Sequence, residues 1–220
     1  MNTNLLHILI AGFLFCTTSV TAQAAPIYDF DSAPIRFGEA NVTVGFQFTA
    51  NANLTINALG FYDHNQDGLT TSHDVGIFDT NGTLLNSTSV SSGTAGALDG
   101  KFRYAAVPSF TLTSGQSYII AGLANGQDGY TYGNVGTTIL GLTTNPAISI
   151  SPLASLFLYA PSFSFPTDNY GYDLYPMVNF KFEDPSISSV PLPAAFPLLG
   201  IGLAGLGGMQ RWFSKRRSII

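Results

Sequence analysis

The sequence predicts an all-β protein with two parts: an exported domain of the β-sandwich or jelly-roll type, and one transmembrane helix near the C-terminus. Two observations carry this prediction. Short segments in which apolar and polar residues alternate follow one another along most of the chain, with clusters of Gly, Asn, Asp and Ser between them. The C-terminal end instead contains a continuous apolar run followed by basic residues, which is typical of a membrane span.

The N-terminal residues 1–24 have the pattern of a secretory signal peptide. A short apolar core, residues 5–16, precedes Ala22 and Ala24, which supply the small side chains of a cleavage site after Ala24. Removal of this segment would also remove Cys16, the single cysteine of the chain. The mature protein would then have no disulfide and no thiol nucleophile, so its stability would depend on core packing.

The exported domain, residues 25–189, contains a clear strand pattern near its start. Val42, Val44, Phe46 and Phe48 point to one face of an extended segment, and the residues between them point to the other. Similar patterns predict strands over residues 54–62, 75–78, 83–85, 102–104, 110–112, 118–120 and 178–182. Strands of this length at this spacing favour a sandwich.

Turn signals separate these predicted strands. Residues 79–82 read Asp-Thr-Asn-Gly and predict a hairpin, and residues 113–116 predict another turn. Residues 134–166 are less regular, which indicates a long loop with one or two strands. Residues 183–189 form a linker to the tail.

Basic and acidic residues are unevenly distributed. Of the eight Lys and Arg residues, four lie after Met209, so the exported domain has four basic residues against all 13 acidic ones, a balance of −9. Nucleic-acid binding needs a basic surface. We therefore expect no nucleic-acid partner.

The tail, residues 190–220, has three consecutive parts. Val190, Pro191, Leu192, Pro193 and Ala194 begin a short motif over residues 190–195. An apolar, glycine-rich run from Phe196 to Met209 then predicts a transmembrane helix over about residues 196–213. The basic tail, residues 211–217, holds four Lys and Arg residues, which stay on the cytoplasmic side and place the preceding domain outside.

This order of motif, span and basic end resembles the PEP-CTERM class of bacterial sorting signals, in its VPLPA variant. The resemblance implies an exosortase (a membrane cysteine protease) as partner, cleavage near the Pro-Leu-Pro motif, and transfer to the cell surface or extracellular matrix. A plain C-terminal anchor without processing and a eukaryotic GPI signal are the alternatives; a GPI signal would end in apolar residues. Residues 42–122 are also similar to a β-sandwich domain of unknown function common in PEP-CTERM proteins, which implies a fold but no activity.

One loop carries a candidate metal site. Asp63, Asn65 and Asp67 alternate before a glycine, and Asp74 follows at the twelfth position of the same register. Oxygen ligands at alternate positions suit calcium, so calcium is a possible cofactor. The alternative is a polar turn rich in Asp, Asn and Gly for backbone reasons. The nearby His73 is expected to make a structural hydrogen bond.

Two tyrosine pairs form a second candidate site. Tyr130 and Tyr132, and likewise Tyr170 and Tyr172, each place two aromatic rings on one side of a strand or loop. Such rings can stack on sugar rings, which would suit a carbohydrate-binding surface. Core packing is the alternative use, because tyrosine has a large apolar body and a polar tip.

The sequence contains no motif for a catalytic nucleophile, a metalloprotease or a phosphate-binding loop. We therefore expect a non-enzymatic surface or matrix protein, sorted by an exosortase and linked to exopolysaccharide and biofilm. The alternatives are a carbohydrate-binding module and a permanently membrane-anchored envelope protein.

Overall fold

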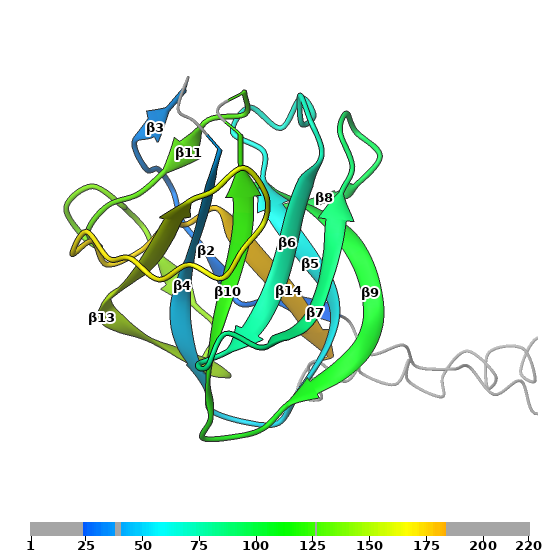
Figure 1. The fold of residues 1–220 in the computed structure, drawn as a ribbon, viewed down its shortest axis with the longest axis vertical. Coiled ribbons are helices and arrows are strands. Elements are labelled where there is room, and N and C mark those ends of the chain that lie inside the picture. The colour runs from blue at the N-terminus through cyan, green and yellow to red at the C-terminus, as the bar shows by residue number, and fades with distance from the viewer. Residues whose placement is uncertain (1–23, 38–40, 126, 184–220) are drawn as a thin grey trace, which may run out of the picture. The chain divides into compact units, whose positions relative to one another are not determined.

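A computed structural model describes residues 24–37, 41–125 and 127–183, and this part of the chain is all-β, as predicted. Two five-stranded sheets face each other (Figure 1). The first contains, in spatial order, β1 (Ala24–Pro26), β14 (Val178–Glu183), β5 (Leu54–Tyr62), β9 (Phe102–Leu112) and β8 (Ala97–Asp99). The second contains β13 (Ile148–Tyr159), β4 (Val42–Ala50), β10 (Ser117–Ala124), β6 (His73–Asp79) and β7 (Leu84–Val90).

Two short ribbons complete the sandwich. They pair β2 (Tyr28–Asp29) with β12 (Thr143–Thr144), and β3 (Ile35–Arg36) with β11 (Tyr130–Thr131). All the strand pairs named are antiparallel. The ribbon of β3 and β11 lies at the end of the sandwich where β4 begins and β13 finishes (Figure 1).

The predicted signal peptide and sorting signal lie almost wholly outside the described residues. Ala24 is the first residue of β1, whereas Ala22, the 190–195 motif, the 196–213 span and the 211–217 basic tail are not described. Within residues 24–37, 41–125 and 127–183, no helix is long and apolar enough to cross a membrane.

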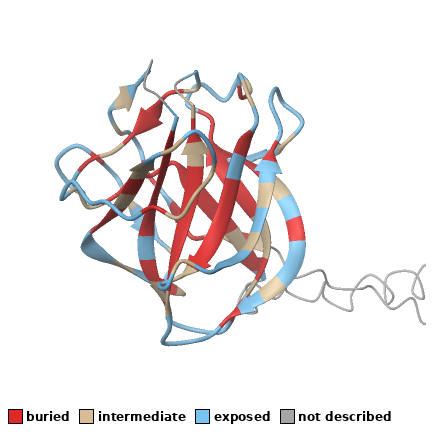
Figure 2. Ribbon diagram, viewed as in Figure 1, coloured by how far each residue is buried: buried red, intermediate tan, exposed pale blue. Residues whose placement is uncertain are grey.

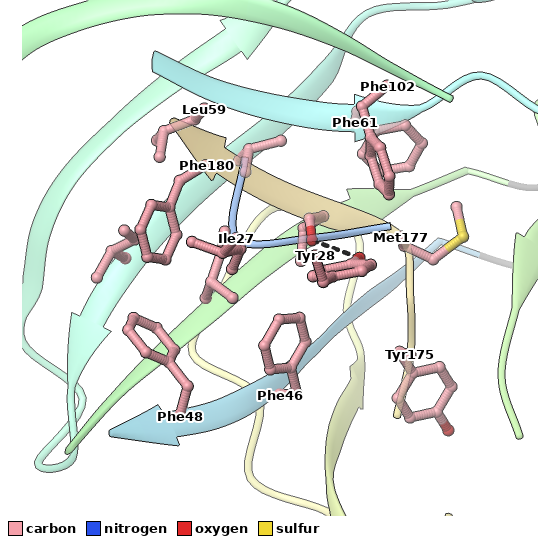
Figure 3. Packing of buried hydrophobic residues seen from close by; sticks show 14 of the residues in the cluster. Ile27, Tyr28, Phe46, Phe48, Leu59, Phe61, Phe102, Tyr175, Met177 and Phe180 are labelled. Atoms are coloured by element: carbon pink, nitrogen blue, oxygen red, sulfur yellow. Dashed lines mark hydrogen bonds between the residues drawn. The ribbon is translucent and has the colours of Figure 1, made fainter. Parts of the chain in front are cut away.

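The core lies between the two sheets and is rich in phenylalanine. The predicted inward face of β4 is confirmed, since Val42, Val44, Phe46 and Phe48 are all buried. Across the interface, the ring centroid of Phe48 lies 5.2 Å from that of Phe180 on β14. Figure 3 shows these rings packed between the sheets.

The N-terminal segment is fixed to the last strand by polar groups inside the core. The Asn179 side chain accepts a hydrogen bond from the Ile27 N–H at 3.1 Å and donates one to the Tyr28 carbonyl at 2.8 Å. The Tyr28 hydroxyl donates to the Val178 carbonyl at 2.7 Å (Figure 3). These bonds satisfy buried groups that would otherwise destabilise the fold.

The outer face of the second sheet is also covered. Residues 160–168, in yellow, cross in front of β4 and β10 (Figure 1), and Phe163 and Phe165 each lie 5.4 Å from Phe78, centroid to centroid. Figure 2 accordingly shows β4, β10 and β6 buried along most of their length, whereas β7 is largely exposed. Gly76 of β6 gives room for this cover, because a Cβ there would meet the Phe163 ring at 3.0 Å.

Most predicted strands are confirmed, with two differences in detail. The segments 102–104 and 110–112 belong to one strand, β9, whose pairing with β5 shifts register between Ile56 and Ala58. The turn at 113–116 connects β9 and β10, which lie in different sheets. The hairpin at 79–82 is confirmed between β6 and β7, with Gly82 at a φ of 89°.

Candidate functional site

An aromatic pocket opens at the end of the sandwich beside β3 and β11. It has a volume of about 130 Å³. Its lining, called the aromatic pocket below, is Val42, Val44, Phe157, Tyr130, Tyr132, Tyr159, Tyr170, Tyr172 and Tyr175. The two tyrosine pairs singled out in the sequence, 130/132 and 170/172, thus converge on one site.

Strand β13 and the segment 160–168, which covers the outer face of the second sheet, position Tyr170. The backbone of Phe157 exchanges two hydrogen bonds with that of Asp168, both at 2.9 Å. Because this fixes the chain just before Tyr170, its ring stacks on Phe157 with 4.1 Å between centroids and 5° between planes. Phe157 is 6% exposed and Tyr170 is 63% exposed, so a buried ring supports an exposed one.

The remaining tyrosines form the wall of the pocket. The rings of Tyr132 and Tyr172 lie 4.5 Å apart, and Tyr175 lies 6.0 Å from Tyr132. The buried Ser155 hydroxyl donates to the Tyr172 carbonyl at 2.7 Å and so fixes that backbone. Burial raises the pKa of Tyr175 well above its usual range, and the neighbouring Tyr130 and Tyr172 add to the effect. Its phenol is therefore neutral at physiological pH.

The four predicted tyrosines differ in how far they are buried. Tyr130 is buried and packs with the core, Tyr132 and Tyr172 are partly buried, and Tyr170 is mostly exposed. Sequence reasoning missed Phe157, Tyr159 and Tyr175. Phe157 and Tyr159 stand at alternate positions within the irregular segment 134–166, and this alternation could have indicated them.

A polar hollow lies at the same end of the sandwich, in the loop between β5 and β6. Its lining includes three of the four residues of the calcium hypothesis, Asp63, Asn65 and Asp67, together with Asp128. The fourth, Asp74, is not in this lining. It is exposed on β6 opposite Ser89 of β7.

The carboxylate of Asp63 is already neutralised by a buried arginine. Arg103 Nε donates to Asp63 Oδ2 at 2.6 Å, and both side chains are at most 5% exposed. The same oxygen accepts the Gly68 N–H at 3.0 Å, and the Arg103 guanidinium also donates to the carbonyl of Gln66 at 3.1 Å. Gln66 has a φ of 61°, a conformation that few residues other than glycine adopt.

These contacts account for the loop without a cation. Over the described residues, no three His, Cys, Asp or Glu side chains gather to hold a metal ion. Calcium binding stays a prediction, and a cation there would lie beside the Asp63–Arg103 pair.

Asp128 connects this loop to the aromatic pocket. Its two carboxylate oxygens accept the N–H groups of Thr70 and Thr71 at 2.6 and 3.1 Å. The carboxylate also lies 2.7 Å from His73 Nε2. Because Asp128 lies two residues before Tyr130, it joins the β5–β6 loop to β11, which carries one of the pocket tyrosines. No sequence pattern pointed to Asp128.

The expected structural role of His73 is confirmed. Its Nδ1 lies 2.8 Å from the Leu123 carbonyl, which can only accept, so Nδ1 donates. The ring is 1% exposed and stacks on Phe61 at 3.8 Å.

The fold and these sites define a β-sandwich domain with an aromatic pocket and a polar loop at one end. Residues 32–176 match a domain of unknown function, DUF4082, and the chain belongs to that family. The match supports the predicted resemblance over residues 42–122 to a domain of unknown function, and extends beyond it on both sides. A search of curated proteins finds no match.

Proposed function

We propose that this protein is an exported, non-enzymatic surface or extracellular-matrix protein whose sandwich domain binds carbohydrate in the aromatic pocket. The observation that carries the proposal is the convergence of Tyr130, Tyr132, Tyr170 and Tyr172 on one pocket from two segments far apart in the sequence. Fold alone would not support a ligand, because one fold hosts many functions.

The chemistry of the pocket suits a sugar ring. A pyranose has apolar C–H faces and hydroxyl groups around its edge, and tyrosine offers an apolar ring with a hydroxyl at its tip. The pocket volume of about 130 Å³ is below the roughly 300–1,000 Å³ of sites for drug-sized ligands. One ring or part of it would therefore enter, while the rest of the glycan lies over Tyr170.

The lining argues for binding rather than catalysis. General acid–base chemistry needs titratable side chains with suitable pKa values. Among the described residues that line the aromatic pocket, none is acidic, basic or a histidine. The site offers aromatic faces on which a ring can stack.

Export and sorting rest on the sequence. The signal peptide 1–24 and the 190–220 tail support secretion, an inner-membrane intermediate, processing by an exosortase, and release to the cell surface or matrix. Carbohydrate binding agrees with this setting, because an exopolysaccharide would be available as ligand in a biofilm.

Carbohydrate binding is tested with the full-length protein on a panel of bacterial and plant polysaccharides, by pull-down and affinity electrophoresis. We expect Tyr170→Ala and Tyr172→Ala to weaken binding at least about tenfold, or about 1.4 kcal/mol. The melting temperature of Tyr170→Ala should stay near that of the parent, because exposed positions change stability little.

Leu98→Ala is the matched control for these variants, since Leu98 is a similarly exposed apolar residue, 43% accessible, on β8 of the other sheet. Equal binding by the parent, Tyr170→Ala and Leu98→Ala would overturn the assignment of the pocket.

Sorting is tested by the intact mass of the protein recovered from the envelope and medium of its native host. A species that starts at Ala25 and ends near Pro193 is expected. A species that still ends at Ile220 in the membrane fraction would instead establish the permanently anchored alternative.

A further inference from the structure

We propose that the aromatic pocket selects an acidic sugar, a pyranose that carries a carboxylate, and that Arg36 binds the carboxylate. This inference rests on the proposed carbohydrate binding and adds the class of ligand. It comes from Arg36, whose guanidinium lies against the ring of the lining residue Tyr132.

Arg36 is held beside the pocket by strand pairing. Its strand β3 pairs with β11, where Arg36 is the partner of Tyr130. The guanidinium carbon lies 5.1 Å from the ring centroid of Tyr132, one of the lining residues. Arg36 is itself exposed, so its N–H groups can be reached from solvent beside Tyr132.

Arg36 differs from the other basic residues of the described chain in its partners. Lys101, Arg103 and Lys181 each pair with a carboxylate, at N–O distances of 3.4, 2.6 and 2.6 Å. In residues 24–37, 41–125 and 127–183, no carboxylate forms a salt bridge with Arg36, which lies instead over the Tyr132 ring.

The chemistry of these groups fits a carboxylated pyranose. A guanidinium is planar, and its donors match the two oxygens of a carboxylate. In a uronic acid the carboxylate is attached to the ring, so a sugar stacked on the pocket tyrosines would bring it within reach of a neighbouring arginine. The described lining contains no carboxylate that would repel it.

The net charge of the chain does not favour the binding of an acidic glycan. The chain has a net charge of −5, so a polyanion gains no general electrostatic attraction. Within the described residues, any preference of the pocket for an acidic glycan is then expected to depend on Arg36.

The test compares oligosaccharides of equal length by calorimetry with the full-length protein: a uronic acid oligomer, a neutral oligomer and a sulfated oligomer. We expect tightest binding to the uronic acid oligomer. Arg36→Gln should weaken that binding about tenfold and leave the neutral oligomer unaffected. Arg36→Lys keeps the charge but not the planar donors. Its affinity for the uronic acid oligomer should therefore lie between that of the parent and that of Arg36→Gln.

Lys101→Gln removes one positive charge elsewhere and serves as the control, with less than about twofold effect expected if screening limits long-range attraction. Neutral binding that exceeds uronate binding, with no effect of Arg36→Gln, would overturn the acidic ligand and leave the carbohydrate-binding function intact. Preference for the sulfated oligomer would overturn the carboxylate. Failure to bind any of the three and any polysaccharide of the panel would overturn both proposals.

Discussion

His73 Nε2 lies 2.7 Å from Asp128 Oδ2, and the histidine ring at the same time stacks on Phe61 inside the sandwich. Nδ1 donates to the Leu123 carbonyl, and the second ring nitrogen faces the Asp128 carboxylate. This pair joins the β5–β6 loop, the end of β10 and the segment before β11. The polar loop and the aromatic pocket are therefore parts of one connected end of the molecule.

Replacing Asp128 by Asn should weaken this connection. Burial alone would raise the pKa of Asp128, but hydrogen bonds from Thr70, His73 and Thr71 outweigh it and lower the pKa below its usual value. An amide retains one acceptor and turns a donor towards N–H groups. We expect a loss of about 1–3 kcal/mol in the free energy of unfolding at neutral pH.

The loss of stability caused by Asp128→Asn should become smaller as the pH falls. A carboxyl whose pKa is lowered by folding stabilises the protein above its unfolded pKa of about 3.9. That stability is lost as the pH falls through the lower, folded value. Urea unfolding at a series of pH values should show the difference between parent and variant shrinking in acid, with the exposed Asp168→Asn as control. A constant difference at every pH would contradict this account.

Removing one partner of the buried Asp63–Arg103 pair should be costly. Both Arg103→Met and Asp63→Asn leave the remaining group without its partner in the interior, which typically costs about 3–5 kcal/mol. Lys101→Met breaks the partly exposed pair with Asp29 and should cost at most about 1 kcal/mol. Urea denaturation curves give both values. Similar losses for Arg103→Met and Lys101→Met would show that the buried pair contributes no more than a surface one.

Removal of calcium should leave the fold unchanged. Because Asp63 is neutralised by Arg103 and Asp74 lies outside the polar hollow, we expect the same melting temperature in EDTA and in millimolar calcium. A rise in melting temperature with calcium that disappears in Asp67→Asn would instead establish the calcium site.

Strand β4 could be predicted from the sequence because one of its faces packs against a single core. Each of Val42, Val44, Phe46 and Phe48 faces one core, so alternation is visible in the chain. Strand β13 was harder to predict. Its pairing with β4 shifts register between Ile150 and Ser155, and Leu153 has a φ of 57°. This irregularity interrupts the period of two and conceals the strand that supplies Phe157.

The candidate site could be predicted only in part from the sequence. Tyrosines at alternate positions marked both sides of the pocket, but only the tertiary fold brings Tyr132 within 4.5 Å of Tyr172. Asp128 and Arg36 lie in short segments without periodicity, so local patterns carry no information on their partners. Arg103 occupies a strand position where sequence favours exposure, and its burial depends on Asp63, which is distant in the chain.

The pairing of the first and last strands has a consequence for folding. β14 lies between β1 and β5, so Ala25 must meet Phe182 before the first sheet is complete. Contacts this distant in sequence slow folding, because the intervening chain loses entropy before any contact compensates it. A nascent chain that lacks β14 would expose an edge of β5 and the Phe48 ring. The domain can therefore reach its native state only when its synthesis is nearly complete.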